Sequence, residues 1–306
     1  QLSLCRRLFW VMIAAGALLA WGLAWLLTRP LSALSRASRE LARGHLNFRA
    51  RVRTRDEVGA LAADFNHMAE TIDTGVSELQ QSVERQERFM GSFAHELKTP
   101  MTSIIGYADL LRTQSLSADE QMDAANYIFS EGKRLEALSL KLLDLLVTKN
   151  SKPAFTAAEP AQLIAALTAQ LRPVYAEQSI RLLNQGAPGW CMMEPDLVRS
   201  LLLNLIDNAR KALESGGTIR IVSEMTASGC RIRVADNGRG MPPEAIAHLT
   251  EAFYRVDKAR SRAQGGAGLG LTLCNEIARL HGGTLSFDSR LNAGTTVTVT
   301  LNGGVV

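Results

Sequence analysis

The strongest constraint on this chain is a run of 21 uncharged residues near its N-terminus, between positions 8 and 28. At 1.5 Å per residue, a helix of this length reaches about 30 Å, which is the thickness of the hydrocarbon core of a bilayer. Trp10 lies near one end of the run, and Trp21 and Trp25 lie toward the other, as is typical of aromatic side chains at a membrane interface. We therefore predict a transmembrane helix with a short N-terminal flank at residues 1–28.

A signal peptide and a buried core helix are the alternatives to a membrane span. A signal peptide has a shorter apolar core followed by a cleavage site of small residues, and the arginine-rich sequence after this run argues against export. The arginine excess places the C-terminal side in the cytoplasm, although Arg6 and Arg7 weaken the contrast. Because the chain begins with Gln1 rather than Met, it is compatible with a fragment that lacks an upstream sensory region and a first span.

Arginine dominates residues 29–55, where Glu40 is the only acidic residue. The arginines of this segment are Arg29, Arg36, Arg39, Arg43, Arg49, Arg51, Arg53 and Arg55. Such a cluster suits nucleic acid, but its position beside an apolar run favours the anionic headgroups of lipids. We expect membrane lipid as a partner and no nucleic acid.

Two amphipathic segments follow the apolar run, at about residues 31–43 and 57–75. We expect Pro30 to break the apolar helix just past the membrane. In each segment, apolar residues recur at three- and four-residue steps, as on one face of a helix. A stretch of low helix propensity at 44–48 separates the two.

Two longer helical patterns come next, each with an apolar seam of period 3.5. The first seam is formed by Met90, Phe93, Leu97, Pro100, Ile104, Tyr107 and Leu111, and the second by Ile128, Leu135, Leu138, Leu142 and Leu145. Such seams pack against other helices, and two helices from each of two chains make a four-helix bundle. His95 lies off the seam with Thr99 one turn later, so we expect both on an outward face.

The C-terminal half alternates helices with strands. We predict strands at 218–223, 230–235, 284–287 and 295–301, and a helix near 195–213 with Leu201, Leu205 and Ala209 on its buried side. This layout predicts an α/β sandwich, in which helices cover one face of a single sheet.

Three polar residues of the predicted helix near 195–213 form one stripe. Asn204, Asn208 and Lys211 are spaced i, i+4 and i+7, on a helix that is otherwise apolar inward. Amide oxygens are good ligands for a hard cation, and a lysine binds phosphate as a point charge. Alone, this stripe would more often be an ordinary solvated face.

The carboxylate of Asp236 is predicted to end a buried strand face. Ile232 and Val234 form the inward set, and alternation places Asp236 on the same side. A buried acid is costly unless a partner donates a hydrogen bond to it. Gly238 and Gly240 allow the backbone to turn tightly. A simple Asn-Gly turn would explain the glycines but not the inward acid.

A glycine-rich loop precedes a helix that runs to about residue 280. Gly266, Gly268 and Gly270, with Leu269 between the last two, open this helix. Free backbone N–H groups and the helix dipole make such a position an anion site. The loop is neither a Walker loop nor a Rossmann fingerprint, because the residues that define those motifs are missing.

The segment FAHELKTP at 93–100 gives these features a common interpretation. Taken with the stripe on the helix, the Asp236 segment and the glycine loop, it resembles the bacterial sensor histidine kinases of two-component systems. His45, His67, His248 and His281 have no such context. The sequence motifs between residues 204 and 296 resemble those of the ATP-binding fold shared by histidine kinases, gyrase, Hsp90 and MutL.

The resemblance implies a multidomain organisation. A HAMP relay would occupy 29–80, and a dimerisation and phosphotransfer (HisKA) domain 81–150, whose two-helix hairpin dimerises into a four-helix bundle. A linker at 151–159 would lead to a catalytic (HATPase_c) domain of Bergerat or GHKL type at 160–306.

The resemblance also implies roles for individual residues. His95 would be the phosphoacceptor, Glu96 the general base, and Thr99 the residue that positions water for phosphatase activity. Asn208 would be the Mg²⁺ ligand. The residues implied to bind ATP are Asn204, Asn208, Lys211, Asp236, Gly238, Gly240, Phe253, Arg255, Gly266, Gly268, Leu269, Gly270 and Thr296.

Two further features bear on the nucleotide. Arg255, Lys258, Arg260 and Arg262 belong to a basic stretch that looks like the family's ATP lid. Many relatives carry an aromatic residue after the lysine of the stripe, where this chain has Ala212.

We therefore expect a membrane-anchored, dimeric, ATP-dependent protein-histidine kinase in the bacterial inner membrane, with its catalytic part in the cytoplasm. It would autophosphorylate His95 from Mg-ATP, transfer the phosphoryl group to an aspartate of a response regulator receiver domain, and also act as its phosphatase. The hydrolytic relatives carry a glutamate four residues before the metal asparagine, where this chain has Asn204.

Three alternatives make different predictions. A scaffold or chemoreceptor-like relay would incorporate no phosphate from ATP. A hydrolase related to gyrase or MutL would release phosphate without forming a phosphoprotein. A nucleic-acid binder would show salt-sensitive DNA binding through the arginine cluster.

Overall fold

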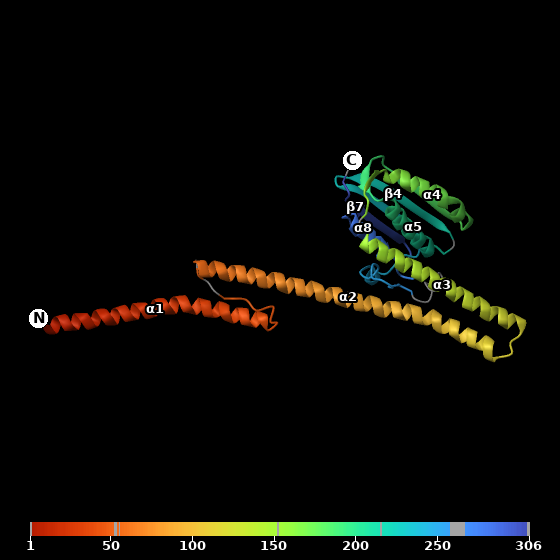
Figure 1. The fold of residues 1–306 in the computed structure, drawn as a ribbon. Coiled ribbons are helices and arrows are strands. Elements are labelled where there is room, and N and C mark those ends of the chain that lie inside the picture. Colours follow the sequence, from red (N-terminus) through yellow and green to blue (C-terminus); the bar gives the residue numbers. More distant parts are fainter. Residues whose placement is uncertain are drawn as a thin grey trace. The chain divides into compact units, whose positions relative to one another are not determined.

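The computed structural model describes residues 2–51, 54, 56–151, 153–214, 216–257 and 267–304 (Figure 1). The chain divides into two compact units, Gln1–Arg88 and Phe89–Val306, and each is described by itself. Some residues named in the sequence analysis fall outside the described residues. They are Arg53, Arg55, Lys258, Arg260, Arg262 and Gly266.

The first unit begins with the long helix α1 (Leu2–Ala42). The expected break at Pro30 is wrong, because α1 continues through it. A proline removes one backbone hydrogen bond, and the other turns keep theirs. Hydroxyls add bonds on either side, with Thr28 Oγ1 donating to the Ala24 carbonyl at 2.7 Å and Ser32 Oγ to the Thr28 carbonyl at 2.8 Å. Among the described residues, Arg7–Ala42 is the one helix long and apolar enough to cross a membrane.

A small core joins α1, the connector after it and the start of α2 (Glu57–Thr113). Ala37, Ala50 and Ala62 are buried together, with Leu34 and Phe65 packed against them. The Asn66 side chain fixes the connector because it accepts from the Ala50 backbone N–H at 2.8 Å and donates to the Ala50 carbonyl at 3.1 Å. The predicted amphipathic segments at 31–43 and 57–75 meet in this small core, through small side chains.

Helix α2 runs without interruption across Gly75 and Pro100, so the expected end near position 75 is wrong. A single glycine costs a helix only about 1 kcal/mol, which the flanking turns outweigh. The hairpin partner is α3 (Ala118–Asn150), which starts with a capping box between Ser117 and Glu120. Tyr107 and Tyr127 stack across the hairpin with their ring centroids 4.7 Å apart.

The predicted seams lie largely inside this hairpin and its contacts. Leu138 and Leu145 of α3 are buried, and Phe93 and Leu97 of α2 are partly buried against the same core. Met90 is the exception among the seam residues, because it is 53% exposed.

A five-stranded sheet forms the C-terminal part of the second unit, with strand order β2-β4-β5-β7-β6. The strands are β2 (Ile180–Gly186), β4 (Gly217–Thr226), β5 (Gly229–Asp236), β6 (Leu285–Arg290) and β7 (Gly294–Leu301). Strands β2 and β4 are parallel, and the other neighbours are antiparallel. The four predicted strands are present, whereas β2 was not anticipated. A second, two-stranded sheet pairs β1 (Thr156–Ala158), inside the range expected as a linker, with β3 (Cys191–Met193).

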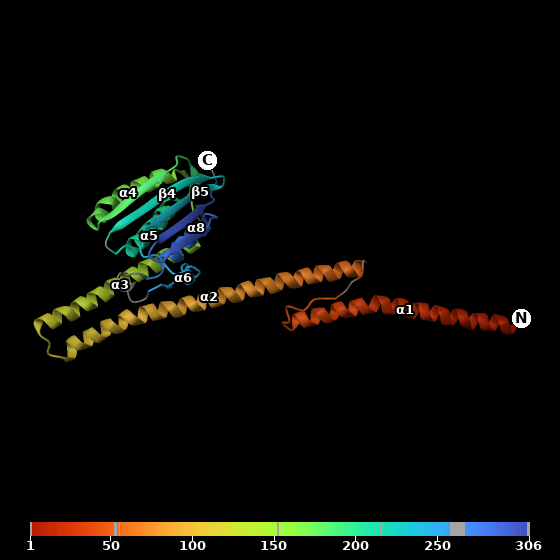
Figure 2. The same cartoon turned by 180° about the vertical axis from the view of Figure 1, so that it is seen from behind.

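Helices cover one face of the five-stranded sheet, as predicted (Figure 2). They are α4 (Pro160–Glu177), α5 (Pro195–Ala212) and α8 (Gly270–Leu280), while the short α6 (Pro243–Ile246) follows β5. The core between these layers also includes residues of α3, so the hairpin and the sandwich form one compact unit. The predicted α/β sandwich is confirmed.

Candidate nucleotide-binding and phosphoacceptor site

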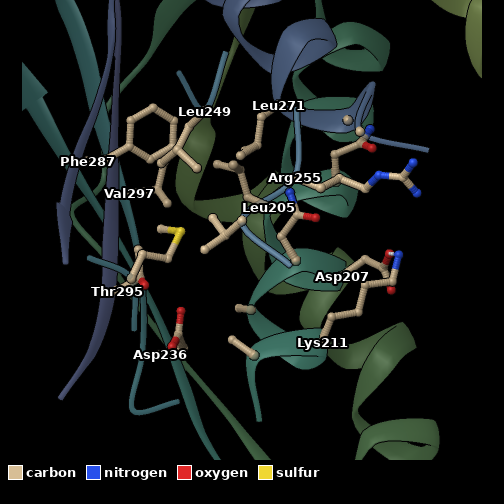
Figure 3. Close-up of a pocket in the computed structure, with 18 of the residues that line it drawn as sticks. Leu205, Asp207, Lys211, Asp236, Leu249, Arg255, Leu271, Phe287, Thr295 and Val297 are labelled. Carbon is tan, nitrogen blue, oxygen red and sulfur yellow. Dashed lines mark ion pairs between the residues drawn. The ribbon is translucent and has the colours of Figure 1, made fainter. Parts of the chain in front are cut away.

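A cavity of about 200 Å³ opens between α5, the ends of β5 and β7, and the loops at 239–257 and 267–268 (Figure 3). The predicted site residues that line it are Asn204, Asn208, Lys211, Asp236, Gly240, Arg255, Gly268 and Gly270. Leu249, Phe287 and Val297 gather on one side of the cavity, and Asp207, Lys211 and Arg255 lie on the other. One side of the cavity is therefore apolar, while the opposite side is charged.

Helix α5 packs against the core with the face opposite the polar stripe, where Leu202 and Ile206 are completely buried. The predicted Leu201, Leu205 and Ala209 are buried beside that face, and Leu205 and Ala209 also line the cavity. Among the stripe residues, the Asn204 amide donates to the Ser200 carbonyl at 2.9 Å, which leaves its oxygen beside the start of α8. Asn208 lines the cavity one turn later.

Asp207 sits between two cations of the same helix. Its carboxylate pairs with Lys211 Nζ at 2.7 Å and with an Arg210 nitrogen at 2.8 Å. Burial acts to raise the pKa of Asp207, but the hydrogen bonds from Lys211 and Arg210 outweigh it and hold the pKa below its usual value. The predicted phosphate-binding lysine is thus already oriented by a carboxylate that the sequence analysis did not single out.

Asp236 lies in the cavity at the end of β5, on the side predicted from strand alternation. Ile232 and Val234 are buried on the same face. Burial raises the pKa of Asp236, and the backbone N–H of Gly238, which donates to the carboxylate at 2.9 Å, only partly opposes this. The site therefore favours a ligand that donates a hydrogen bond to this carboxylate.

Strand β7 presents Thr295 and Val297 to the cavity, and Thr296 is absent from its lining. Successive side chains of a strand point to opposite faces, and Thr296 pairs with Ala235 and Asp288 in the register. Thr295 therefore faces the cavity, and the predicted Thr296 faces the other side of the sheet.

The glycines of the loops hold backbone turns that a side chain would block. Gly240 has φ +64°, and a Cβ there would lie 1.9 Å from the Arg290 carbonyl oxygen. Gly268 has φ +71°, and a Cβ there would lie 2.8 Å from the Phe253 backbone. Gly238 and Leu269 do not line the cavity, and Leu269 is buried at the start of α8.

Phe253 is placed against the hairpin and not in the cavity. Its backbone has φ +66°, and its ring centroid lies 5.4 Å from that of Phe89 and 6.2 Å from that of Phe93. This aromatic cluster joins α2 to the loop that contains Phe253.

The predicted acceptor and its neighbour point in different directions. His95 is exposed on α2, whereas Glu96 is 9% exposed. The Glu96 carboxylate accepts hydrogen bonds from Arg255 and, at 3.5 Å, from Arg134 of α3. Thr99 Oγ1 donates to the His95 carbonyl at 3.2 Å, one turn along the helix. The structure thus connects Glu96 to the edge of the cavity, while His95 is not among the described lining residues.

Lys141 of α3 also lines the cavity, which the sequence analysis missed. A second, smaller cavity beside it is lined by Glu96, Pro100, Arg134 and Lys141 among others. In the sequence, Lys141 is only a polar residue beside the seam residue Leu142, and nothing local marks it as facing a ligand.

Three family models match the chain in order. They are HAMP at residues 22–74, the His kinase A phospho-acceptor domain at 85–146, and the histidine kinase-, DNA gyrase B- and HSP90-like ATPase domain at 193–304. A curated relative is the signal transduction histidine-protein kinase AfsQ2 of Streptomyces coelicolor, 28% identical over 302 residues. That match covers 94% of this chain and 55% of AfsQ2, so the chain spans about half the length of this relative.

Solved structures share the fold. Histidine kinase ThkA, in complex with the response regulator protein TrrA, matches 74% of this chain and 66% of its own with a TM-score of 0.57 and 21% identity. Full-length ShkA in complex with AMPPNP matches 72% of this chain and 47% of its own, with a TM-score of 0.50 and 22% identity. The ordered HAMP, phospho-acceptor and ATPase matches, on this helical hairpin and α/β sandwich, show that the chain belongs to the sensor histidine kinases of two-component systems.

Proposed function

We propose that this chain uses ATP to phosphorylate its own His95 and then passes the phosphoryl group to an aspartate of a response regulator. One observation carries the proposal. The exposed His95 is followed by a buried Glu96 whose carboxylate is held by an arginine that also lines the candidate nucleotide cavity. Acceptor, base and nucleotide site are therefore parts of one compact unit.

The cavity suits an adenine nucleotide. The carboxylate of Asp236 would accept a hydrogen bond from the exocyclic amine of the base, with the apolar wall of Leu249 and Phe287 against the ring. Lys211 would contact the phosphates, and Arg255 would approach their outer end. In support, the related ShkA structure contains the ATP analogue AMPPNP.

The donor set also suits Mg²⁺, which binds hard oxygen ligands. Asn208 lines the cavity and offers an amide oxygen, and the phosphate oxygens would complete the coordination. When bound, the ion would neutralise part of the phosphate charge. The Asn208 side chain would hold it, with the Asn204 amide one turn away.

His95 would act as the nucleophile. A neutral imidazole ring nitrogen attacks the terminal phosphorus, the bond to the leaving ADP oxygen breaks, and Glu96 takes up the proton of the other ring nitrogen. Glu96 is bound to Arg255 and Arg134 in the structure, so its action as a base requires those contacts to change. Transfer from the same chain and transfer from a partner chain both satisfy this chemistry.

A homodimer would cover the apolar residues that one hairpin leaves exposed. On α2 and α3 these residues are Met101, Ile105, Met122, Phe129, Leu140, Leu143 and Val147. Packing two copies of the hairpin would bury them in a four-helix bundle.

We also propose that α1 anchors the chain in the bacterial inner membrane, with the arginine cluster against anionic headgroups and the catalytic part in the cytoplasm. Thr99, one turn after His95, would position water when the same protein removes the phosphoryl group from its regulator. The complex of ThkA with TrrA supports a receiver domain as the partner.

Phosphotransfer to a panel of receiver domains tests this proposal. The chain in lipid nanodiscs is incubated with Mg²⁺ and radiolabelled ATP, separated from nucleotide, and mixed with each receiver. We expect label to leave the chain and appear on one receiver within minutes, and no label in the His95→Gln variant. His67→Gln is the matched control, because His67 is exposed on the same helix outside the site. Label that persists in His95→Gln would exclude His95 as the acceptor.

A further inference from the structure

Lys141 of α3 lines the nucleotide cavity. Among the described lining residues it alone comes from the helical hairpin, and the others belong to the sandwich and its loops. The same side chain lines the smaller cavity around Glu96 and Arg134. Lys141 therefore stands at the junction between the nucleotide site and the predicted general base.

The Lys141 ammonium has no carboxylate partner of its own among the described residues. Burial and the nearby Lys211 ammonium lower the pKa of Lys141, and the carboxylates of Asp207 and Asp144 only partly offset them. Asp207 is already paired with Lys211 and Arg210. Within the described residues, no carboxylate lies within ion-pair distance of the Lys141 ammonium. The ammonium groups of Lys141 and Lys211 therefore lie near one carboxylate, that of Asp207, which is already paired. The site has an excess of positive charge.

An anion is the ligand that this arrangement accommodates. It would relieve the repulsion between Lys141 and Lys211 and complete the hydrogen bonds of a partly buried ammonium. The cavity has its adenine-compatible wall on the side of Leu249 and Phe287, and Lys211 lies on the opposite side (Figure 3). The anionic part of a nucleotide bound in this orientation is its phosphate chain.

We propose that Lys141 binds the phosphate chain of the nucleotide, so that the hairpin completes the nucleotide site when the sandwich packs on it. The proposal rests on the function proposed above, and it adds a ligand from a helix outside the ATP-binding domain. By linkage, a nucleotide that contacts Lys141 must stabilise the packing of the sandwich on α3 by the same factor by which that packing raises nucleotide affinity. Nucleotide binding is thereby coupled to the position of Lys141, which also lines the smaller cavity beside Glu96.

The test measures binding of ADP and of adenosine to the full chain in nanodiscs by titration calorimetry. Lys141→Met removes the charge and keeps an unbranched side chain of similar length. Lys141→Arg keeps the charge. Lys133→Met is the matched control, since Lys133 is an exposed lysine of the same helix whose ion pair with Glu136 is also exposed. His95→Gln serves as the background, so that phosphotransfer does not enter the measurement.

We expect Lys141→Met to weaken ADP binding roughly tenfold, the effect of one hydrogen bond to a charged group. Adenosine affinity should be unchanged, Lys141→Arg should bind ADP close to the parent, and Lys133→Met should match the parent for both ligands. The proposal is overturned if Lys141→Met binds ADP as tightly as the parent, or if ADP and adenosine weaken equally. Failure of the parent chain to bind ADP at all would instead contradict the proposed function, which separates the two results.

Discussion

The carboxylate of Glu96 accepts a hydrogen bond from the guanidinium of Arg255, a residue 159 positions later in the chain. The Arg255 side chain is 4% exposed and that of Glu96 is 11% exposed, so water screens this contact little. Arg255 also lines the nucleotide cavity. One arginine thus contacts the predicted base and borders the nucleotide site.

Glu96→Gln tests the role of this carboxylate. If Glu96 is the general base, the rate of phosphate incorporation into the chain should fall by about 10²–10⁴-fold. ADP affinity should change little, because Glu96 does not line the nucleotide cavity. Single-turnover rates at saturating ATP provide the measurement, with circular dichroism to show that the fold is kept. A rate within roughly threefold of the parent would remove Glu96 from the reaction.

Asp236→Asn should separate binding from stability. We expect nucleotide affinity to fall about tenfold or more, as for a lost hydrogen bond to a charged group. The nucleotide-free variant should nevertheless be more stable than the parent at neutral pH, because burial raises the pKa of Asp236 and so penalises its charged form in the folded state. ADP titrations and denaturant unfolding at pH 7 measure the two effects.

The pH dependence of that difference follows from its sign. Asp236 binds a proton more readily when folded, so its cost is present above its raised pKa and disappears as pH falls toward the usual value of 3.8. The stability advantage of Asp236→Asn should therefore shrink between pH 7 and pH 4. An advantage that grows on acidification would contradict the assigned direction.

His281 should contribute a pH dependence of the opposite sign. It is buried, its Nδ1 donates to the Ile277 carbonyl at 2.8 Å, and its Nε2 accepts from the Glu194 backbone N–H at 3.1 Å. Burial lowers its pKa, so the folded state binds fewer protons than the unfolded chain and loses stability as pH falls from about 7 through the ordinary value of 6.5. His281→Gln keeps an acceptor for Glu194, and its unfolding free energy should vary less between pH 7 and pH 5. Equal slopes in the two proteins would contradict this account.

Two glycine-to-alanine changes should have opposite effects. At Gly240, the positive φ and the Arg290 carbonyl leave no space for a Cβ, so Gly240→Ala should destabilise the second unit by about 2 kcal/mol or more. Gly132 lies within α3 with nothing within 4 Å of an added Cβ, so Gly132→Ala should stabilise it by up to about 1 kcal/mol. Denaturant midpoints compare the pair. A neutral Gly240→Ala would mean that the turn after β5 is not constrained as described.

Local periodicity predicted much of the site. The two-residue period of β5 placed Asp236 at the end of a buried face, and the helical spacing of Asn204, Asn208 and Lys211 brought all three to the cavity. These positions depend on neighbours a few residues away. Periodicity gave no guidance on β7, because threonines at successive positions leave no hydrophobic pattern to set its faces. Thr296 was expected from the family resemblance alone, and Thr295 lines the cavity.

Other features depend on contacts that no local pattern encodes. The pairing of Glu96 with Arg255 and the position of Lys141 in the cavity arise from the packing of the sandwich on the hairpin. The continuity of α1 through Pro30 depends on a long helix outweighing one lost hydrogen bond. In each case a non-local or cumulative energy determined the result.

The most direct measurement is the chemical identity and position of the bond formed with ATP. The full chain in nanodiscs is incubated with Mg-ATP, divided between acid and base, and digested for mass spectrometry under conditions that preserve phosphohistidine. The account predicts phosphate on His95 that is lost in acid and survives in base. Tight nucleotide binding without any such phosphoramidate, or phosphate confined to another residue, would contradict it.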